Sequence, residues 1–273
     1  MNLYGLVGHP VGHSLSPVLH NWGFARQRLS AVYEAWDVAP EDLPAWVEAM
    51  RRVPLRGASV TIPHKESVLP LLDALTPLAR RVGAVNTLFW RENALTGDNT
   101  DFAGCLHALR GKVPAAALVL GAGGVARAVL AGLEQTGIRD ILVAARSPDK
   151  AAPLARDFPC RLIPWEDRTA ALAAPGQGLV VNATPLGMRG PLAGQSPFAD
   201  EDWPVAISPE ATACDTVYIP RETHFLRQAR ARGWRAVDGL AFFLAQGLAQ
   251  FRLWTGLDLP LDEAERVLAK ACR

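Results

Sequence analysis

Residues 115–136 read AAALVLGAGGVARAVLAGLEQT, an order of residue types that predicts a strand, a glycine turn and a helix. The apolar run ends at Gly121, with Gly123 and Gly124 just beyond it. In such a turn the first glycine permits the bend and the second lets backbone N–H groups approach a pyrophosphate. The third position, here Ala126, needs only a small residue for helix–strand packing. The stretch therefore predicts a dinucleotide site at a helix N-terminus. The alternative is a tight strand–helix turn without a ligand.

The segment after the next predicted strand, residues 141–145, favours NADP over NAD. In this fold the end of the second strand meets the adenosine ribose, where NAD proteins place a carboxylate and NADP proteins accommodate a 2′-phosphate with arginine. Here Arg146 and Ser147 follow the strand, and Lys150 lies one helical turn further on. Two cations and a hydroxyl suit a 2′-phosphate. The alternative is a solvated basic loop.

Alternating strand and helix patterns predict a two-domain α/β protein. Residues 1–100 already form an α/β unit before the glycine turn. Strands are predicted beyond the turn at residues 141–145, 161–164, 179–182, 213–217 and 234–237. We expect an N-terminal α/β substrate domain at residues 1–100, completed by C-terminal helices within 239–273. Residues 101–238 are expected to form a Rossmann-type, doubly wound NADP-binding domain.

Composition excludes several classes of protein. The 273 residues carry 28 Lys and Arg against 27 Asp and Glu, which predicts no nucleic-acid partner. No apolar run approaches the roughly 18 residues of a membrane span, and no signal peptide is evident. The four cysteines are scattered without metal-ligand spacing. We therefore expect a cytoplasmic protein with no metal and no membrane partner.

The loop at residues 8–17 carries two serines before a predicted helix. Ser16 followed by Pro17 suits a helix start, because the hydroxyl can cap the helix and proline favours its first position. A cap alone would account for Ser16. Ser14 lies before it with no evident local role, so Ser14 is a candidate binding residue.

Residues 57–66 predict a strand whose polar side chains gather near its end. In extended geometry alternate side chains share a face, which would place Ser59, Thr61, Pro63 and Lys65 together. Pro63 denies the backbone a ladder bond, so pairing should stop there. The alternative is a solvated strand end.

Two further polar residues interrupt predicted elements. Asn86 lies in the apolar run 83–88, predicted as a strand, where a buried amide must be either structural or a ligand contact. Asp101 precedes a helical pattern, and by itself it would be interpreted as a helix cap.

Taken in order, these segments resemble the shikimate dehydrogenase family over nearly the whole chain. The motifs are GHSLSP (12–17), VTIPHK (60–65), GAVNT (83–87), NTD (99–101), GAGGVA (121–126), Arg146 with Ser147, NATPLGM (182–188), Tyr218 with Pro220, and the segment 239–247. Each motif is weak alone, whereas their ordered series is specific.

The resemblance implies NADPH-dependent, reversible reduction of 3-dehydroshikimate to shikimate, a step in aromatic amino-acid biosynthesis. Lys65 and Asp101 would form the catalytic pair that moves a proton at the substrate oxygen. Their residue types do not settle which is the formal acid or base. No metal is implied, because nicotinamide carries the hydride. The protein would be a monomer or a homodimer.

The resemblance also implies the binding residues. Substrate would contact Ser14, Ser16, Thr61, Asn86, Asp101, Tyr218 and Gln246. NADP would contact Gly121, Ala122, Gly123, Gly124, Val125, Arg146, Ser147, Lys150, Asn182, Thr184, Thr216 and Gly239.

The chain departs from the family pattern at four positions. Ala145 and Ser59 stand where Asn is usual, Phe242 where Met is common and His224 where Pro is common. Ser59 matters most, because serine has a shorter reach and no amide donors. A substrate hydroxyl contact would then be lost or bridged by water.

Two alternative functions remain open from the sequence. One is a relative that also accepts quinate or NAD, against which Arg146 and Lys150 argue. The other is a catalytically silent, NADP-binding regulatory paralogue, which would need neither Lys65 nor Asp101.

Overall fold

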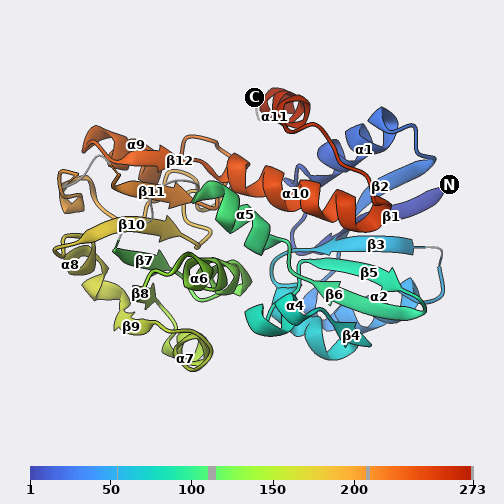
Figure 1. The fold of residues 1–273 in the computed structure, drawn as a ribbon, viewed down its shortest axis with the longest axis horizontal. Coiled ribbons are helices and arrows are strands. Elements are labelled where there is room, and N and C mark those ends of the chain that lie inside the picture. The colour runs from blue at the N-terminus through green and yellow to red at the C-terminus, as the bar shows by residue number, and fades with distance from the viewer. Residues whose placement is uncertain (54, 110–114, 207–209, 272–273) are drawn as a thin grey trace. The chain divides into compact units, whose positions relative to one another are not determined.

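The structure, a computed structural model, describes residues 1–53, 55–109, 115–206 and 210–271. The chain folds into two compact α/β units, drawn in Figure 1. Unit 1 comprises Met1–Thr100 with Leu244–Arg273, and unit 2 comprises Asp101–Phe243. The chain returns to unit 1 within the long helix α10 (Gly239–Thr255).

Unit 2 is built on a six-stranded parallel sheet. Its strands are β7 (Ala116–Leu120), β8 (Asp140–Ala145), β9 (Arg161–Pro164), β10 (Gln177–Asn182), β11 (Thr212–Asp215) and β12 (Arg235–Val237). Their spatial order is β12-β11-β10-β7-β8-β9, which Figure 1 lets the reader follow. Every neighbouring pair is parallel. This order is doubly wound, with its switch point between β7 and β10, so the predicted Rossmann-type fold is confirmed.

Helices and a large aromatic cluster bury the strands of unit 2. The α-helices are α5 (Asp101–Ala108), α6 (Gly124–Thr136), α7 (Pro148–Asp157), α8 (Arg168–Leu172) and α9 (His224–Ala231). Trp203 packs against Phe198, Phe225 and Trp234, with ring centroids 5.3–5.6 Å apart. The central strand β7 is wholly buried, as expected of a parallel strand covered on both faces.

Unit 1 contains a mixed sheet. Its strands are β1 (Asn2–Gly8), β2 (Ala31–Asp37), β3 (Leu55–Val60), β4 (Ala74–Leu75), β5 (Thr87–Arg91) and β6 (Ala94–Asp98), in the order β2-β1-β3-β5-β6-β4. Strands β1, β2 and β3 run parallel, whereas β5 is antiparallel to both β3 and β6.

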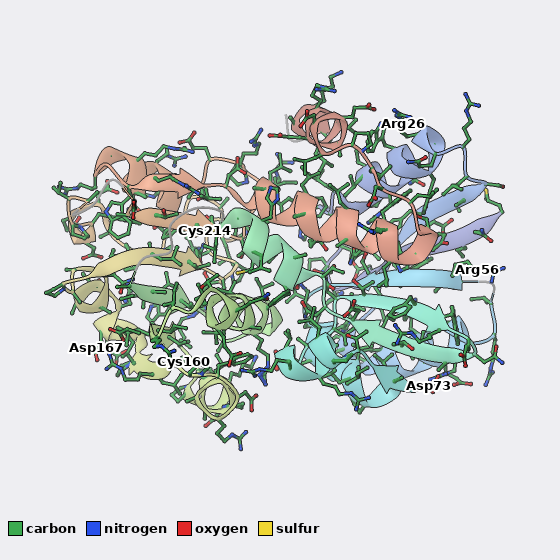
Figure 2. The ribbon with its side chains drawn as sticks, in the orientation of Figure 1. Arg26, Arg56, Asp73, Cys160, Asp167 and Cys214 are labelled. Carbon is green, nitrogen blue, oxygen red and sulfur yellow. The ribbon has the colours of Figure 1, made fainter. Side chains whose placement is uncertain are left out.

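The α-helices of unit 1 are α1 (Ser16–Arg26), α2 (Leu43–Met50), α3 (His64–Ser67), α4 (Pro77–Val82), the second half of α10, and α11 (Leu261–Ala271). Arg26, labelled in Figure 2, forms an exposed ion pair from α1 to Glu263 of α11 at 3.0 Å. The C-terminal helices expected within 239–273 are α10 and α11, and the last two residues of that range lie outside the described residues.

Two predicted strands of unit 1 are wrong in detail. Strand β3 ends at Val60, and Lys65 lies in the short helix α3, so Thr61 and Lys65 are not alternate residues of one strand. Proline at position 63 ends the ladder, and the chain turns into a helix directly after it. Asn86 lies just before β5 rather than inside a strand, because Gly83 ends α4 with φ +70° and leaves few residues before Thr87. Its backbone still bonds to both neighbours, since the Asn86 N–H donates to the Asp98 oxygen at 3.1 Å and the Asn86 oxygen accepts from the Val60 N–H at 2.8 Å.

Two kinds of feature are absent from the described residues. Among them, no helix has both the length and the apolar character needed to cross a membrane. The same residues contain no group of three or more His, Cys, Asp or Glu side chains placed to hold a metal ion.

Candidate active site

The predicted cofactor residues of unit 2 all lie at the carboxyl ends of its parallel strands. The glycine turn follows β7, Arg146 to Lys150 follow β8, and Asn182 to Thr184 follow β10. Thr216 follows β11, and Gly239 follows β12. Parallel strands bring these segments to one edge of the sheet, where ligands bind in open α/β folds.

The backbone of the glycine turn fits a pyrophosphate. Gly121 has φ +109°, and a Cβ there would lie 2.9 Å from the carbonyl oxygen of Ala183, so only glycine suits the position. A Cβ on Gly123 would meet nothing within 4 Å, which leaves this side of the backbone open. Helix α6 begins at Gly124 and presents its first N–H groups here. An anionic ligand could approach closely.

The segment after β8 fits a 2′-phosphate. Arg146 and Lys150 are both exposed. Ser147 is the N-cap residue of α7, yet its side chain makes no capping hydrogen bond, so its hydroxyl is not used in that way. The end of β8 therefore presents two cations and a hydroxyl. The residues of unit 2 fit NADP at both the pyrophosphate and the ribose positions.

Asn182 and Thr184 shape the loop after β10 with their side chains. The Asn182 amide donates to the carbonyl oxygen of Leu186 at 3.1 Å and to Asp215 at 3.0 Å. Its Oδ1 accepts from the Thr184 hydroxyl at 2.6 Å and from the Thr184 N–H at 3.1 Å. Both amide hydrogens of Asn182 are thus used within the protein. The Asn182 side chain therefore fixes the conformation of this loop, and the loop presents its backbone to a ligand.

Asp215, a residue that the sequence interpretation missed, is the centre of this network. Its carboxylate is fully buried and accepts from Asn182, from the Val217 N–H at 3.0 Å and from the Thr223 hydroxyl at 2.6 Å. Burial raises the pKa of Asp215 to about 7, although these hydrogen bonds favour the charged form. Thr223 also caps α9, so one carboxylate ties three segments together. The available signal was an acidic residue ending an apolar strand.

The segment after β11 lies close to the start of α10. The Thr216 hydroxyl donates to the backbone oxygen of Asn182 at 2.9 Å. The ring of Tyr218 packs on Phe243, with centroids 4.5 Å apart. A Cβ on Gly239 would lie 2.3 Å from the Val217 carbonyl oxygen, so glycine is required by the close approach of the two backbones.

The predicted substrate residues of unit 1 come from segments at one edge of its sheet. The Ser14 loop follows β1, Thr61 and Lys65 follow β3, and Asn86 precedes β5, which runs antiparallel to β3. Backbone hydrogen bonds join neighbouring segments. The His9 N–H donates to the Ile62 oxygen at 2.9 Å, and the Val85 N–H donates to the Lys65 oxygen at 2.7 Å.

The two serines interact with each other, and Ser16 is not the helix cap that its sequence context suggested. The residue before α1 is Leu15, and Ser16 is the first helical residue and makes no side-chain cap. Ser14 instead accepts a hydrogen bond from the Ser16 N–H at 3.2 Å, and the two hydroxyls lie 3.2 Å apart. Ser14 therefore has the local role that the sequence interpretation missed, because its hydroxyl satisfies an N–H of the first helical turn.

Asn86 joins the end of β6 to helix α10. Its amide donates to the Thr100 hydroxyl at 3.0 Å and to Gln246 Oε1 at 3.3 Å. Its Oδ1 accepts from the Thr87 hydroxyl at 2.8 Å and from the Thr100 N–H at 2.7 Å. Two predicted substrate residues, Asn86 and Gln246, are thus direct hydrogen-bond partners.

Ser59, the main departure from the family pattern, is buried within unit 1. Its hydroxyl accepts from the Tyr33 phenol at 2.6 Å and donates to Gln250 Oε1 at 2.9 Å. The short side chain leaves the space that the Tyr33 hydroxyl occupies. This arrangement explains a serine at this position.

The proposed catalytic residues belong to different units. Lys65 lies half-buried in α3 of unit 1. Asp101 is the first residue of α5 and of unit 2, and its side chain is buried.

The doubly wound sheet with its glycine turn, together with a second α/β unit lined by polar side chains, defines a two-domain dinucleotide-dependent dehydrogenase. Residues 6–88 match the family model of the shikimate dehydrogenase substrate binding domain. Residues 239–269 match the model of the shikimate 5'-dehydrogenase C-terminal domain. A shikimate dehydrogenase (NADP(+)) from Oleidesulfovibrio alaskensis is 50% identical over 98% of this chain and 95% of its own. The chain therefore belongs to the shikimate dehydrogenase family.

Solved structures extend the likeness to the fold. Shikimate 5-dehydrogenase from Thermus thermophilus, in complex with NADP(H) and shikimate, has a TM-score of 0.85 and 41% identity. The match covers 99% of this chain and all of that one. Quinate dehydrogenase from Corynebacterium glutamicum, in complex with NAD, has a TM-score of 0.86 at 29% identity, covering 98% of this chain and 99% of that one.

Proposed function

We propose that this protein is an NADP-dependent shikimate dehydrogenase that reversibly reduces 3-dehydroshikimate to shikimate. The 50% identity to a shikimate dehydrogenase (NADP(+)) over nearly the whole chain carries this conclusion. The NADP-type residues after β7 and β8 agree with it.

The residues of unit 2 would hold the cofactor. The backbone of Gly121 to Val125 would bind the pyrophosphate, and Arg146, Ser147 and Lys150 the 2′-phosphate. The loops that carry Asn182, Thr184, Thr216 and Gly239 would line the nicotinamide end. Bound NADP supplies the hydride acceptor for shikimate oxidation and, in its reduced form, the donor for the reverse reaction.

The protein's own side chains would bind the acid and move its proton. Hydrogen bonds to the substrate would come from Ser14, Ser16, Thr61, Asn86, Asp101, Tyr218 and Gln246. Lys65 and Asp101 would exchange the proton at the substrate oxygen whose carbon takes part in hydride transfer. The ammonium can donate a proton to that oxygen during reduction, and the amine can accept it during oxidation.

Formation of NADPH from shikimate tests this function. We expect the wild type to reduce NADP with shikimate as the only organic substrate. Lys65→Ala should lower kcat by about 10²- to 10⁴-fold, because general acid–base catalysis is lost, with NADP affinity retained. Lys270→Ala, an exposed lysine on α11, is the matched control and should retain full activity. A near wild-type rate in Lys65→Ala would show that Lys65 has another role.

A quinate dehydrogenase is the second candidate, because the C. glutamicum enzyme shares the fold at 29% identity. Arg146 and Lys150 favour NADP instead. Specificity constants for both acids with both cofactors separate the candidates, and a larger value for quinate with NAD would overturn our proposal. Binding of NADP without turnover of either acid would indicate the regulatory paralogue.

We also propose a cytoplasmic location, which suits the free thiols of Cys105, Cys160 and Cys214. The assembly is proposed to be a monomer or a homodimer, and sedimentation equilibrium would distinguish these states.

A further inference from the structure

We propose that three buried residues of unit 1, Tyr33, Ser59 and Gln250, are positioning residues for the substrate. They act through Asn86 and Gln246, two of the side chains assigned to substrate binding. The inference rests on the proposed function, because it assumes that these two amides contact shikimate.

The three positioning residues begin a buried chain of hydrogen bonds between hydroxyl and amide groups. Tyr33, Ser59 and Gln250 are only 2%, 4% and 1% exposed, so water cannot replace a lost partner at these positions. The Tyr33 phenol donates to the Ser59 hydroxyl at 2.6 Å, and that hydroxyl donates to Gln250 Oε1 at 2.9 Å. The serine proton is thereby committed to the glutamine oxygen.

The second half of the hydrogen-bond chain links the Gln250 amide to the predicted substrate residues Asn86 and Gln246. With its oxygen facing Ser59, Gln250 presents Nε2 to the Asn86 backbone oxygen and to the Thr87 hydroxyl, both at 3.0 Å. The Thr87 hydroxyl donates to Asn86 Oδ1 at 2.8 Å. The Asn86 amide then donates to Gln246 Oε1 at 3.3 Å.

Every link donates in the same direction, from Tyr33 to Gln246. Such one-directional chains polarise one another and strengthen each bond. This series of hydrogen bonds leaves α10 at Gln250 and returns to the same helix one turn earlier, at Gln246.

The functional consequence follows from the symmetry of side-chain amides. Asn and Gln can flip by half a turn with little change of shape, which exchanges a donor for an acceptor. A substrate hydroxyl or carboxylate distinguishes these two orientations. The chain that starts at Tyr33, together with the Thr100 N–H that donates to Asn86 Oδ1, selects one of them for Asn86 and through it for Gln246, which fixes the hydrogen-bond pattern offered to the acid.

Packing holds the start of the chain in place. The Tyr33 ring stacks on His20 of α1, with centroids 4.6 Å apart and planes inclined by 24°. The phenol therefore reaches Ser59 from a ring that has little freedom to move.

Steady-state kinetics and calorimetric binding of shikimate to Ser59→Ala and Tyr33→Phe test the proposal. Loss of one net hydrogen bond predicts a rise in both KM and Kd for shikimate of about 3- to 10-fold, larger in Ser59→Ala. KM for NADP should not change, because its residues lie in unit 2. Ser59→Thr keeps the hydroxyl and should restore most of the affinity.

Tyr4→Phe is the matched control. Tyr4 is also a buried tyrosine of unit 1, packed on Phe24 and Trp254, and its hydroxyl is not a member of the chain. This variant should keep the wild-type KM for shikimate.

The outcomes separate the two proposals. If the wild type oxidises shikimate but Ser59→Ala and Tyr33→Phe keep its KM and Kd within about twofold, the positioning role is wrong. An equal rise in both Michaelis constants, or a rise in Tyr4→Phe as well, would also overturn it, because a general loss of structure would then explain the effect. Failure of the wild type to oxidise shikimate would instead overturn the proposed function.

Discussion

The two units each contain a buried hydrogen-bonded network behind their predicted binding residues, but the networks differ in charge. In unit 1 the chain from Tyr33 to Gln246 consists only of hydroxyls and amides. In unit 2 the network converges on the carboxylate of Asp215. A neutral network needs no desolvated charge, whereas a buried carboxylate must be offset by several donors.

The difference has a structural meaning. A chain of neutral groups can fix the orientation of amides one after another, which suits a surface that must match a substrate with several hydroxyls. A carboxylate accepts several hydrogen bonds at once and can therefore hold separate segments at one point. Asp215 does this for the loops after β10 and β11 and for the start of α9. We expect one buried group in each unit, His20 and Asp215, to change the free energy of unfolding with pH in opposite directions.

The largest expected effect comes from His20, which stacks on Tyr33 in unit 1. Burial lowers the pKa of His20 from 6.5 to about 3, so the folded state excludes the proton. This contribution to stability is complete above about pH 6.5 and is lost as pH falls towards 3, by on the order of 5 kcal/mol in total. His20→Phe keeps an aromatic ring without the titration. Urea unfolding across this range should show a smaller acid-side loss in the variant, and equal losses would contradict the assignment.

Asp215 should produce an effect of opposite sign and similar size. Burial raises the pKa of Asp215 from 3.8 to about 7, so the charged carboxylate is less favourable in the folded state than in the unfolded chain. The stability contribution is present below pH 3.8 and is lost as pH rises through 7, on the order of 4 kcal/mol. Asp215→Asn stays neutral. The free energy of unfolding of the wild type minus that of Asp215→Asn should therefore decrease between pH 4 and 8, and a constant difference would count against a raised pKa of Asp215.

Restoring the family's usual residue at Ser59 should destabilise this protein. In Ser59→Asn the larger side chain would enter the space of the Tyr33 hydroxyl, which lies 2.6 Å from the serine oxygen. Overpacking predicts a loss of about 1–3 kcal/mol in the free energy of unfolding. The double variant Ser59→Asn with Tyr33→Phe removes the clashing hydroxyl and should recover part of the loss. Additive losses in urea unfolding would show that the two positions are independent.

The smallest effect is expected at the surface. The Arg26–Glu263 ion pair joins α1 and α11 but is exposed at both ends. Solvent and salt screen such pairs, so Arg26→Ala should leave the unfolding midpoint almost unchanged. A large, salt-sensitive shift of the unfolding midpoint in Arg26→Ala would contradict the expectation that this surface ion pair contributes little to stability.

Local patterns were predictable because neighbours in sequence determine them. Strand β7, the turn at Gly121 and the start of α6 lie within a few residues of one another, and apolar periodicity with glycine placement defines them. The assignment of Arg146 and Lys150 to a 2′-phosphate rests on their position after the next strand and stays a prediction. The errors fell where proline or glycine punctuated the chain, at Lys65 and Asn86, because alternation alone cannot show where pairing stops.

The sequence by itself determined the doubly wound cofactor half and, through an ordered series of motifs, the family. Only the tertiary structure decided how the polar residues are used. Ser59 and Gln250 are 191 residues apart, and Asn182 and Asp215 are 33 apart. The partner of a buried hydroxyl or carboxylate depends on strand order, register and helix packing, and these bring together groups that no local pattern connects.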